Sequence, residues 1–185
     1  LLLHYQPKVD LATRRSTELE ALIRWQRQDG LVSPAHFLPV AEDSELIVPI
    51  GSWVLLEASR QIARWRAAGL PIERVSVNVS AHQFARPDFV GTVQRVLSSA
   101  RLPARHLELE VTETSLMDDV EAAVEKLRVL RELGVRVSVD DFGTGYSSLS
   151  YLQRLPVDVL KIDRAFVKDL DGEGLARQHA RALTE

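Results

Sequence analysis

Two adjacent aspartates, Asp140 and Asp141, end a segment in which valines alternate with polar residues from position 135 onward. Such alternation is typical of a strand with one apolar and one polar face. Glycines follow at positions 143 and 145, and glycine permits the backbone dihedrals of a tight loop beside a ligand. Neighbouring carboxylates at a strand end can bridge two hard metal ions, although an isolated Asp-Asp pair is more often a solvated turn. The pair therefore indicates a metal site only if further ligands converge on it.

Other polar residues occupy similar positions near the ends of further strand-like segments. They are Glu20 in residues 17–25, Asn78 in residues 74–80, Glu110 in residues 106–112 and Lys161 in residues 157–163. If the apolar residues of these segments pack against helices, the first three side chains and Asp140 project together to the opposite side of the sheet. Lys161 joins them only if its two apolar neighbours face the helices, which is the arrangement we expect.

The four carboxylates of this set, counting Asp141, cannot all ionise without positive charge nearby. One lysine, Lys161, does not neutralise four acids, so a divalent metal ion is the simplest answer. An all-oxygen ligand set favours Mg²⁺ or Mn²⁺ over zinc. Two simpler roles stay open at this point: Asn78 could bond to nearby backbone, and Glu108 could pair with Arg136 lower in the molecule without taking part in any chemistry.

The elements that carry these side chains follow the pattern of a parallel α/β sheet. Residues 1–11 and 17–25 predict a β-hairpin, and helices are expected to start at Ser33-Pro34 and near Ile50. From Asn78 onward strands and helices alternate, which indicates parallel strands joined by right-handed crossovers, with a short helix over residues 147–155. A closed barrel of this kind needs eight strands. Six strands therefore predict either an open sheet or a barrel that lacks its last two units.

Composition narrows the class of protein. The chain has 185 residues, a net charge of −3, 45% apolar residues and no cysteine. These values predict one soluble, cytoplasmic domain without disulfides, although the parent chain could be anchored in a membrane. The negative charge argues against polymeric nucleic acid as a partner, and no apolar run reaches the length of a membrane span, so we expect no membrane contact from this segment.

Six short motifs carry a resemblance to a known family. They are Tyr5-Gln6-Pro7-Lys8, Glu20-Ala21-Leu22-Ile23-Arg24-Trp25, Asn78-Val79-Ser80, Glu110-Val111-Thr112-Glu113, Asp140-Asp141-Phe142-Gly143-Thr144-Gly145 and Lys161-Ile162-Asp163. In this order and spacing the chain resembles an EAL domain, the bacterial module that hydrolyses the second messenger cyclic di-GMP to linear pGpG. The resemblance implies a TIM-like (β/α) barrel with an antiparallel first strand, of which about six strands fall within this sequence.

The resemblance also implies a role for each site residue. Metal ligands are Glu20, Asn78, Glu110 and Asp140, with Asp140 and Asp141 contributing to a second Mg²⁺ or Mn²⁺ ion. Among the catalytic residues, Asp141 acts through that second ion, Lys161 contacts the nucleophilic water and Glu113 braces the loop over residues 142–147. Substrate contacts are Gln6, Leu22 and Arg24, the last of them to a phosphate.

The resemblance is incomplete at the end of the chain. The family's seventh strand carries a Glu-Gly-Val-Glu motif and its eighth a Gln-Gly pair, and neither occurs in this sequence. We therefore expect residues 1–185 to form a single EAL domain truncated before those strands, inactive by itself, and part of a parent that carries sensor or GGDEF-type domains and could form a homodimer.

Two other functions stay open. A catalytically inactive EAL domain would act as a cyclic di-GMP receptor or regulatory module, usually after the loss of one of these acids, and none is lost here. An unrelated magnesium barrel, such as a relative of enolase, would explain the acids but neither Tyr5-Gln6-Pro7 nor Arg24.

Overall fold

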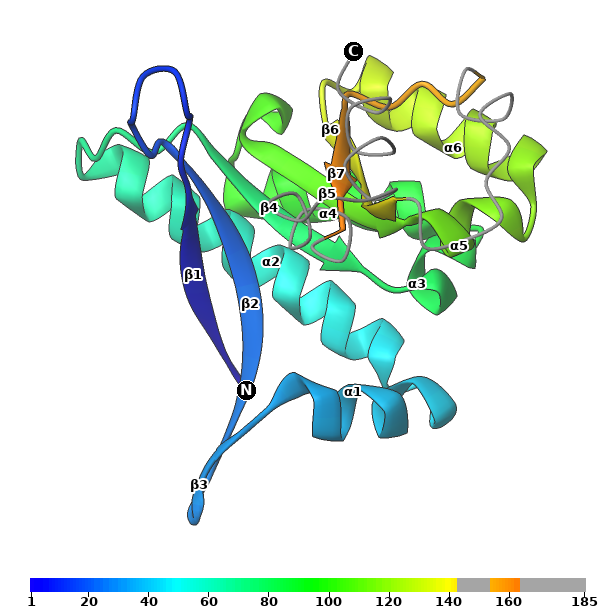
Figure 1. Cartoon of the computed structure of the whole chain (residues 1–185), viewed down its shortest axis with the longest axis horizontal. Coiled ribbons are helices and arrows are strands. Elements are labelled where there is room, and N and C mark those ends of the chain that lie inside the picture. Colours follow the sequence, from blue (N-terminus) through cyan, green and yellow to red (C-terminus); the bar gives the residue numbers. More distant parts are fainter. Residues whose placement is uncertain (143–153, 164–185) are drawn as a thin grey trace, which may run out of the picture.

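A seven-stranded sheet forms the centre of the computed structural model, which describes residues 1–142 and 154–163 (Figure 1). The strands are β1 (Leu2–Lys8), β2 (Glu18–Arg27), β3 (Gly30–Val32), β4 (Arg74–Val79), β5 (Leu107–Thr112), β6 (Arg136–Phe142) and β7 (Val159–Ile162). Their order is β1-β2-β4-β5-β6-β7, and β3 pairs with the far end of β2. Strands β1 and β3 run antiparallel to β2, whereas all other neighbours are parallel. The predicted hairpin and parallel order are confirmed, and β3 is an additional strand.

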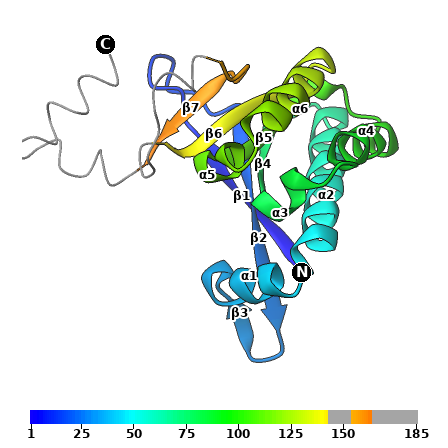
Figure 2. The same ribbon diagram turned by 90° about the vertical axis from the view of Figure 1, so that its right-hand side faces the viewer.

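Helices cover one face of this sheet, as Figure 2 shows for α2, α4 and α6. The helices are α1 (Pro34–Asp43), α2 (Ile47–Ala67), α3 (Ala81–Ala85), α4 (Phe89–Ala100), α5 (Glu113–Met117) and α6 (Val120–Glu132), with a 3-10 turn over Ala104–His106. Val77, Leu109 and Val139 lie on the covered face and are fully buried in one apolar cluster. The alternation of the strands thus leaves the polar side chains on the other face, as predicted.

The sheet has two free edges among the described residues, because β1 and β7 stand at opposite ends of the strand order. The architecture is therefore that of a TIM-like (β/α) barrel whose first strand is antiparallel and whose wall is not closed within residues 1–142 and 154–163. None of the helices in these two ranges combines the length and apolar character that a bilayer crossing requires.

Several element ends differ from those expected. Helix α2 starts at Ile47, before Pro49, because a proline in the first turn removes an N–H that has no partner there. Helix α6 is capped by Asp119, whose Oδ1 accepts from the N–H of Ala122 at 3.1 Å, whereas Asp118 ends the short helix α5. The helix expected over residues 147–155 lies largely outside the described residues.

Two short helices, α3 and α5, follow directly on strands β4 and β5. Each is capped by the hydroxyl at the strand end: Ser80 Oγ accepts from Gln83 N at 3.2 Å, and Thr112 Oγ1 accepts from Ser115 N at 3.4 Å. Helices of five residues are too short to show a 3.6-residue period in the sequence, so they were not predicted. Their caps fix the carboxyl ends of the two strands that carry candidate site residues.

Candidate active site

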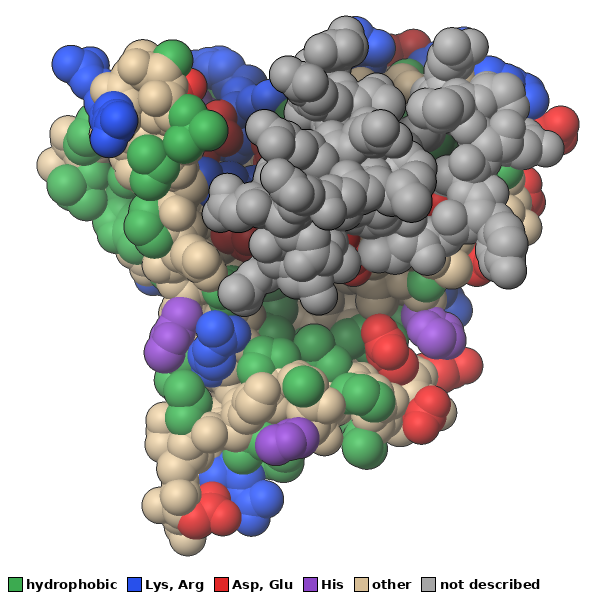
Figure 3. All heavy atoms as spheres, in the orientation of Figure 1, with side chains coloured by type: hydrophobic (Ala, Val, Ile, Leu, Met, Phe, Trp, Pro, Cys, Tyr) green, Lys and Arg blue, Asp and Glu red, His purple; other side chains and the backbone are tan. Residues whose placement is uncertain are grey.

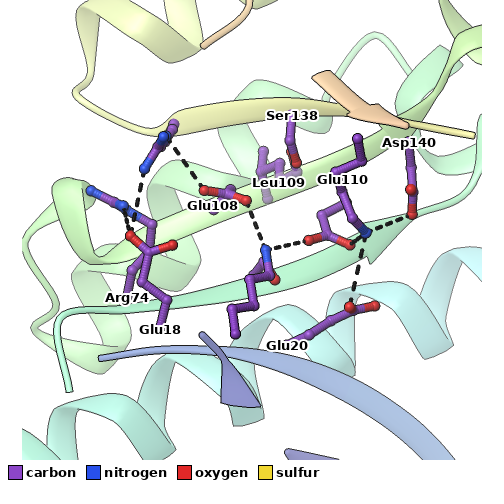
Figure 4. A network of polar contacts seen from close by, with 12 residues as sticks. Glu18, Glu20, Arg74, Glu108, Leu109, Glu110, Ser138 and Asp140 are labelled. Atoms are coloured by element: carbon purple, nitrogen blue, oxygen red, sulfur yellow. Dashed lines mark hydrogen bonds and ion pairs between the residues drawn. The ribbon is translucent and has the colours of Figure 1, made fainter. Parts of the chain in front are cut away.

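The acids of three strands meet the ammonium group of Lys161 at the carboxyl ends of the strands (Figure 4). Lys161 Nζ lies 2.7 Å from Glu110 Oε2, 2.8 Å from Asp140 Oδ2 and 3.9 Å from Glu20 Oε2. These side chains come from β5, β6, β2 and β7, which are far apart in the sequence. The expected inward direction of Lys161 is confirmed, and the ring of acids has a positive charge at its centre.

Glu110 is the most buried member of this group, with 1% of its surface exposed. Its Oε2 accepts from Lys161, and its Oε1 accepts from Lys8 Nζ at 2.7 Å. Burial by itself would raise the pKa of Glu110, but the two ammonium groups outweigh burial and lower it. Burial would in turn lower the pKa of Lys161, yet its bonds to Asp140 and Glu110 and the charge of Glu20 raise that pKa. Both partners are therefore ionised at neutral pH.

Lys8 is a site residue that the sequence analysis missed. Its Nζ contacts Glu110 at 2.7 Å and Glu108 Oε1 at 3.0 Å. A signal for it existed, because the hairpin register pairs Lys8 with Glu18 and Gln6 with Glu20, and directly paired residues of neighbouring strands point to the same face. Lys8 also ends a motif that the sequence analysis had singled out.

A second layer of charges lies beside the first, towards the amino ends of the strands (Figure 4). Arg136 Nε stands 3.5 Å from Glu108 Oε2 and its Nη1 3.5 Å from Glu18 Oε1, while Arg74 Nη1 bonds the same oxygen of Glu18. The ion pair expected between Glu108 and Arg136 is thus confirmed. This layer pairs two arginines with two glutamates and is neutral.

The upper layer keeps a negative excess. Glu20, Glu110 and Asp140, with Asp141 beside them, are four acids, whereas Lys8 and Lys161 supply two positive charges. One lysine was expected among these acids, so the charge imbalance is smaller than predicted. A negative net charge in a partly buried polar site still attracts a cation.

Asn78 orients one of the candidate ligands. Its Nδ2 donates to Glu20 Oε1 at 2.9 Å, a bond between side chains of the neighbouring strands β2 and β4. The simpler expectation, a bond to nearby backbone, is therefore wrong for this amide group. Its position keeps Asn78 beside the acids, as the resemblance implied.

The Asp140–Asp141 step departs from regular strand geometry. The β6–β7 register shifts between Val139 and Phe142, and Asp141 has a left-handed backbone with φ of 55°. Its N–H donates to Asp140 Oδ1 at 3.0 Å. Such a bulge interrupts the alternation of side chains, which in a regular strand would send adjacent residues to opposite faces. Partial burial and the negative charges of Asp140 and Asp163 raise the pKa of Asp141.

A cavity of about 280 Å³ lies next to the acids. Leu22, Arg24, Asn78 and Glu110 line it, and helices α1 and α2 contribute an apolar wall; hydrophobic side chains gather above α1 in the space-filling view (Figure 3). Arg24 Nη1 donates to the carbonyl of Ile23 at 2.8 Å, and Arg24 forms no ion pair with a carboxylate among the described residues. Its guanidinium is therefore available to an anionic ligand.

The remaining predicted residues lie at the margin of this site. Gln6 is exposed and pairs in register with Glu20, so it shares the polar face without lining the cavity. Glu113 is 4% exposed and is the first residue of α5. The loop that Glu113 is predicted to brace lies, from residue 143 onward, outside the described residues.

No three acidic or histidine groups in residues 1–142 and 154–163 form a ready-made metal cluster. The ammonium of Lys161 stands between the acids and gives the physical reason. The chemistry of the donors nevertheless fits a hard cation, because three carboxylates surround the ammonium group of Lys161 and the amide side chain of Asn78 bonds to one of them.

Comparison with known proteins agrees with these features. The EAL domain family model matches residues 1–185. MucR of Pseudomonas aeruginosa, named a bifunctional diguanylate cyclase/cyclic di-GMP phosphodiesterase, is 49% identical over 171 residues, covering 92% of this chain and 25% of that protein. The cyclic di-GMP phosphodiesterase PdeR of Escherichia coli is 41% identical over 184 residues, covering 99% of this chain and 28% of that protein. This chain therefore spans about a quarter of the length of these curated relatives.

Solved structures give the same result. The PaMucR phosphodiesterase in complex with c-di-GMP superimposes with a TM-score of 0.92 at 46% identity, covering 98% of this chain and 74% of that chain. The EAL enzyme Bd1971, with cAMP and cyclic di-GMP bound, gives 0.90 at 34% identity, covering 98% of this chain and 50% of that chain. With its matching family model, its polar strand ends and its antiparallel first strand, the chain belongs to the EAL domain family.

Proposed function

We propose that this domain, within its full-length protein, hydrolyses one phosphodiester bond of cyclic di-GMP to give linear pGpG, with the help of divalent cations. The observation that carries the proposal is the meeting of Glu20, Glu110 and Asp140 around Lys161, beside a cavity that Arg24 lines. The names of the relatives and the nucleotide-bound structures support this choice of substrate.

Four residues would hold the first cation: Glu20, Asn78, Glu110 and Asp140. Asp140 and Asp141 would contribute to a second cation, because the bulge removes these neighbours from strict alternation. EAL phosphodiesterases as a family depend on divalent metal, and we propose Mg²⁺ or Mn²⁺ on the basis of the all-oxygen donors. Bound there, such ions lower the pKa of a coordinated water and offset negative charge on the phosphoryl oxygens.

The chain's own cationic groups would orient the substrate and the attacking water. Lys161, which already donates to Glu110 and Asp140, has three ammonium protons and is placed to hold a water next to them. Arg24 would bind a phosphate through its planar fork of N–H donors, which matches phosphate oxygens better than a point charge does. Leu22 would pack against the nucleotide and Gln6 would hydrogen-bond to it. We propose that Glu113 braces the loop beside the metal centre.

We also propose that this module is part of a larger signalling protein with sensor or GGDEF-type domains, as the greater length of its curated relatives supports. Three expectations stay predictions: that residues 1–185 form one domain lacking two strands, that the protein forms a homodimer, and that it is located in the cytoplasm.

Replacing Glu20 by alanine tests the function. In the full-length protein we expect loss of pGpG formation, measured by chromatography with Mn²⁺ present, together with weaker Mn²⁺ binding in calorimetry, because no neighbouring side chain can replace this carboxylate. Glu132→Ala, a change of an exposed glutamate on α6, is the matched control. Turnover of Glu20→Ala within about tenfold of that of the unsubstituted protein, a barrier change of only ~1.4 kcal/mol, would contradict the assignment. Binding of cyclic di-GMP by the parent protein without any pGpG formation would favour the receptor alternative.

A further inference from the structure

The two oxygens of the Glu110 carboxylate have different partners. Oε1 accepts from Lys8 at 2.7 Å, and Oε2 accepts from Lys161 at 2.7 Å. The Glu110 side chain has no exposed surface, so these two ammonium groups, and not solvent, satisfy it. Each oxygen of this buried carboxylate is therefore assigned to one cationic group.

Lys8 is the more firmly anchored of the two lysines with respect to the candidate ligands. Its second partner is Glu108, at 3.0 Å, which is 3% exposed in its side chain and is itself held by Arg136 at 3.5 Å. Lys161, by contrast, forms ion pairs with Glu110, Asp140 and Glu20, and within residues 1–142 and 154–163 all three of these partners are proposed metal ligands. A cation that enters where those acids converge therefore meets Oε2 of Glu110, while Lys8 keeps Oε1.

Divalent cations differ in whether they readily bind one oxygen or both oxygens of a carboxylate. Ca²⁺ takes six to eight oxygen ligands and accepts bidentate carboxylates, whereas Mg²⁺ needs near-octahedral geometry with fewer, closer ligands. We propose that Lys8 is a specificity-determining residue that restricts Glu110 to one ligand oxygen and so disfavours Ca²⁺ relative to Mg²⁺. This inference rests on the proposed function, because it assumes the cation site at Glu20, Glu110 and Asp140.

The ratio of two affinities tests the proposal without any measurement of turnover. Calorimetric titrations with Mg²⁺ alone and with Ca²⁺ alone give two Kd values for the parent protein and for Lys8→Met. Removal of one positive charge strengthens the attraction for both ions alike, so that effect cancels in the ratio. The freed oxygen should shift the ratio towards Ca²⁺ by about tenfold, since ligand number and charge tune Ca²⁺ affinity over several orders of magnitude.

Two matched variants separate this effect from general damage. Lys8→Arg keeps a donor to both glutamates and should leave the ratio within about twofold of the parent, the precision of the comparison. Glu108→Gln removes a charge from the other partner of Lys8 but leaves Lys8 on Glu110, so it should also leave the ratio unchanged. If Lys8→Met does not fold, as judged by circular dichroism, Lys8→Leu, which also lacks a donor, is held to the same tenfold expectation.

The outcomes are distinct for this inference and for the proposed function. A parent protein that binds neither ion overturns the cation site itself. A parent that binds both ions, with an unchanged ratio in the folded Lys8 variant, overturns only the role of Lys8. An equal shift in Lys8→Arg or Glu108→Gln would show that the ratio responds to disturbance of the network and would likewise overturn it.

Discussion

Replacing Lys161 by methionine tests whether its ammonium group occupies the place of a metal ion. The change removes one positive charge from contacts with Glu110 at 2.7 Å, Asp140 at 2.8 Å and Glu20 at 3.9 Å. Removing one partner of a buried ion pair costs roughly 3–5 kcal/mol, because the other charge stays buried without compensation. Lys161 is 27% and Asp140 23% exposed, and solvent screens part of the cost, so we expect about 3 kcal/mol. For a chain of this length that is a fall in Tm of about 6–12 °C.

The assay is thermal unfolding followed by circular dichroism, first in EDTA and then with increasing Mg²⁺. Mg²⁺ should restore much of the lost stability of Lys161→Met, because the cation supplies the positive charge that the acids have lost. At about 100 times its Kd a bound ion adds ~2.7 kcal/mol. The variant should gain more than the parent at equal Mg²⁺, since in the parent the ion competes with the ammonium group.

Lys126→Met is the matched control. Lys126 donates to the carbonyls of Phe84 at 2.7 Å and Ala85 at 2.9 Å, away from the acids, so this variant should lose stability in a way that Mg²⁺ does not repair. A Tm of Lys161→Met in EDTA within about 2 °C of the parent, less than 1 kcal/mol, would refute the reasoning. An equal response of the parent and both variants to Mg²⁺ would refute it as well.

Three further changes give separate tests. Arg24→Ala should raise the Kd for cyclic di-GMP by about 10- to 150-fold, the value of one charged hydrogen bond, and leave Mn²⁺ affinity unchanged; parallel losses of both in calorimetry would indicate a structural role instead. Burial lowers the pKa of His106, whose Nδ1 donates to the carbonyl of Glu73 at 2.5 Å. Below about pH 6.5 the unfolded chain therefore binds more protons than the folded one. The free energy of unfolding should fall as the pH drops from there towards the lowered pKa. Urea unfolding between pH 5 and pH 7 measures this slope, which His106→Gln should flatten; an unchanged slope would exclude His106 as its source. Gly51→Ala would place a Cβ 2.1 Å from Oε1 of the buried Gln83, so the free energy of unfolding should fall by about 1–3 kcal/mol. A second change, Gln83→Ala, should largely remove this loss in the same unfolding assay.

The sequence by itself determined which face of each strand carries chemistry. Valine and leucine at alternate positions of β4, β5 and β6 must be buried by helices, and this alone sends Asn78, Glu110 and Asp140 to the opposite face. Lys161 needed a further assumption, because both faces of β7 carry apolar residues; its expected direction is confirmed, although Leu160 on the other face is exposed. The side-chain period of a strand is a local property of the sequence. The alternation of strands and helices along the chain is likewise enough to predict parallel strands joined by crossovers.

The ends of the elements depended on hydrogen bonds that the period of a segment does not contain. Ser80 and Thr112 start new helices where the strands end, and Asp119, not its neighbour, caps α6. The choice between the two adjacent aspartates rests on the backbone: Asp118 is helical, whereas Asp119 has the non-helical backbone that aims its oxygen at the N–H groups of the first turn.

Apart from the Glu108–Arg136 pair, the pairing of the charges was decided by the tertiary structure. Lys8 is 102 residues from Glu110 in the sequence, and no local pattern says which of the several acids on the polar face an ammonium group reaches. The bulge at Asp141 is of the same kind, because it depends on the register between β6 and β7. Contacts across a barrel interior depend on side-chain length, register and strand twist acting together, and these meet only when all the strands are in place.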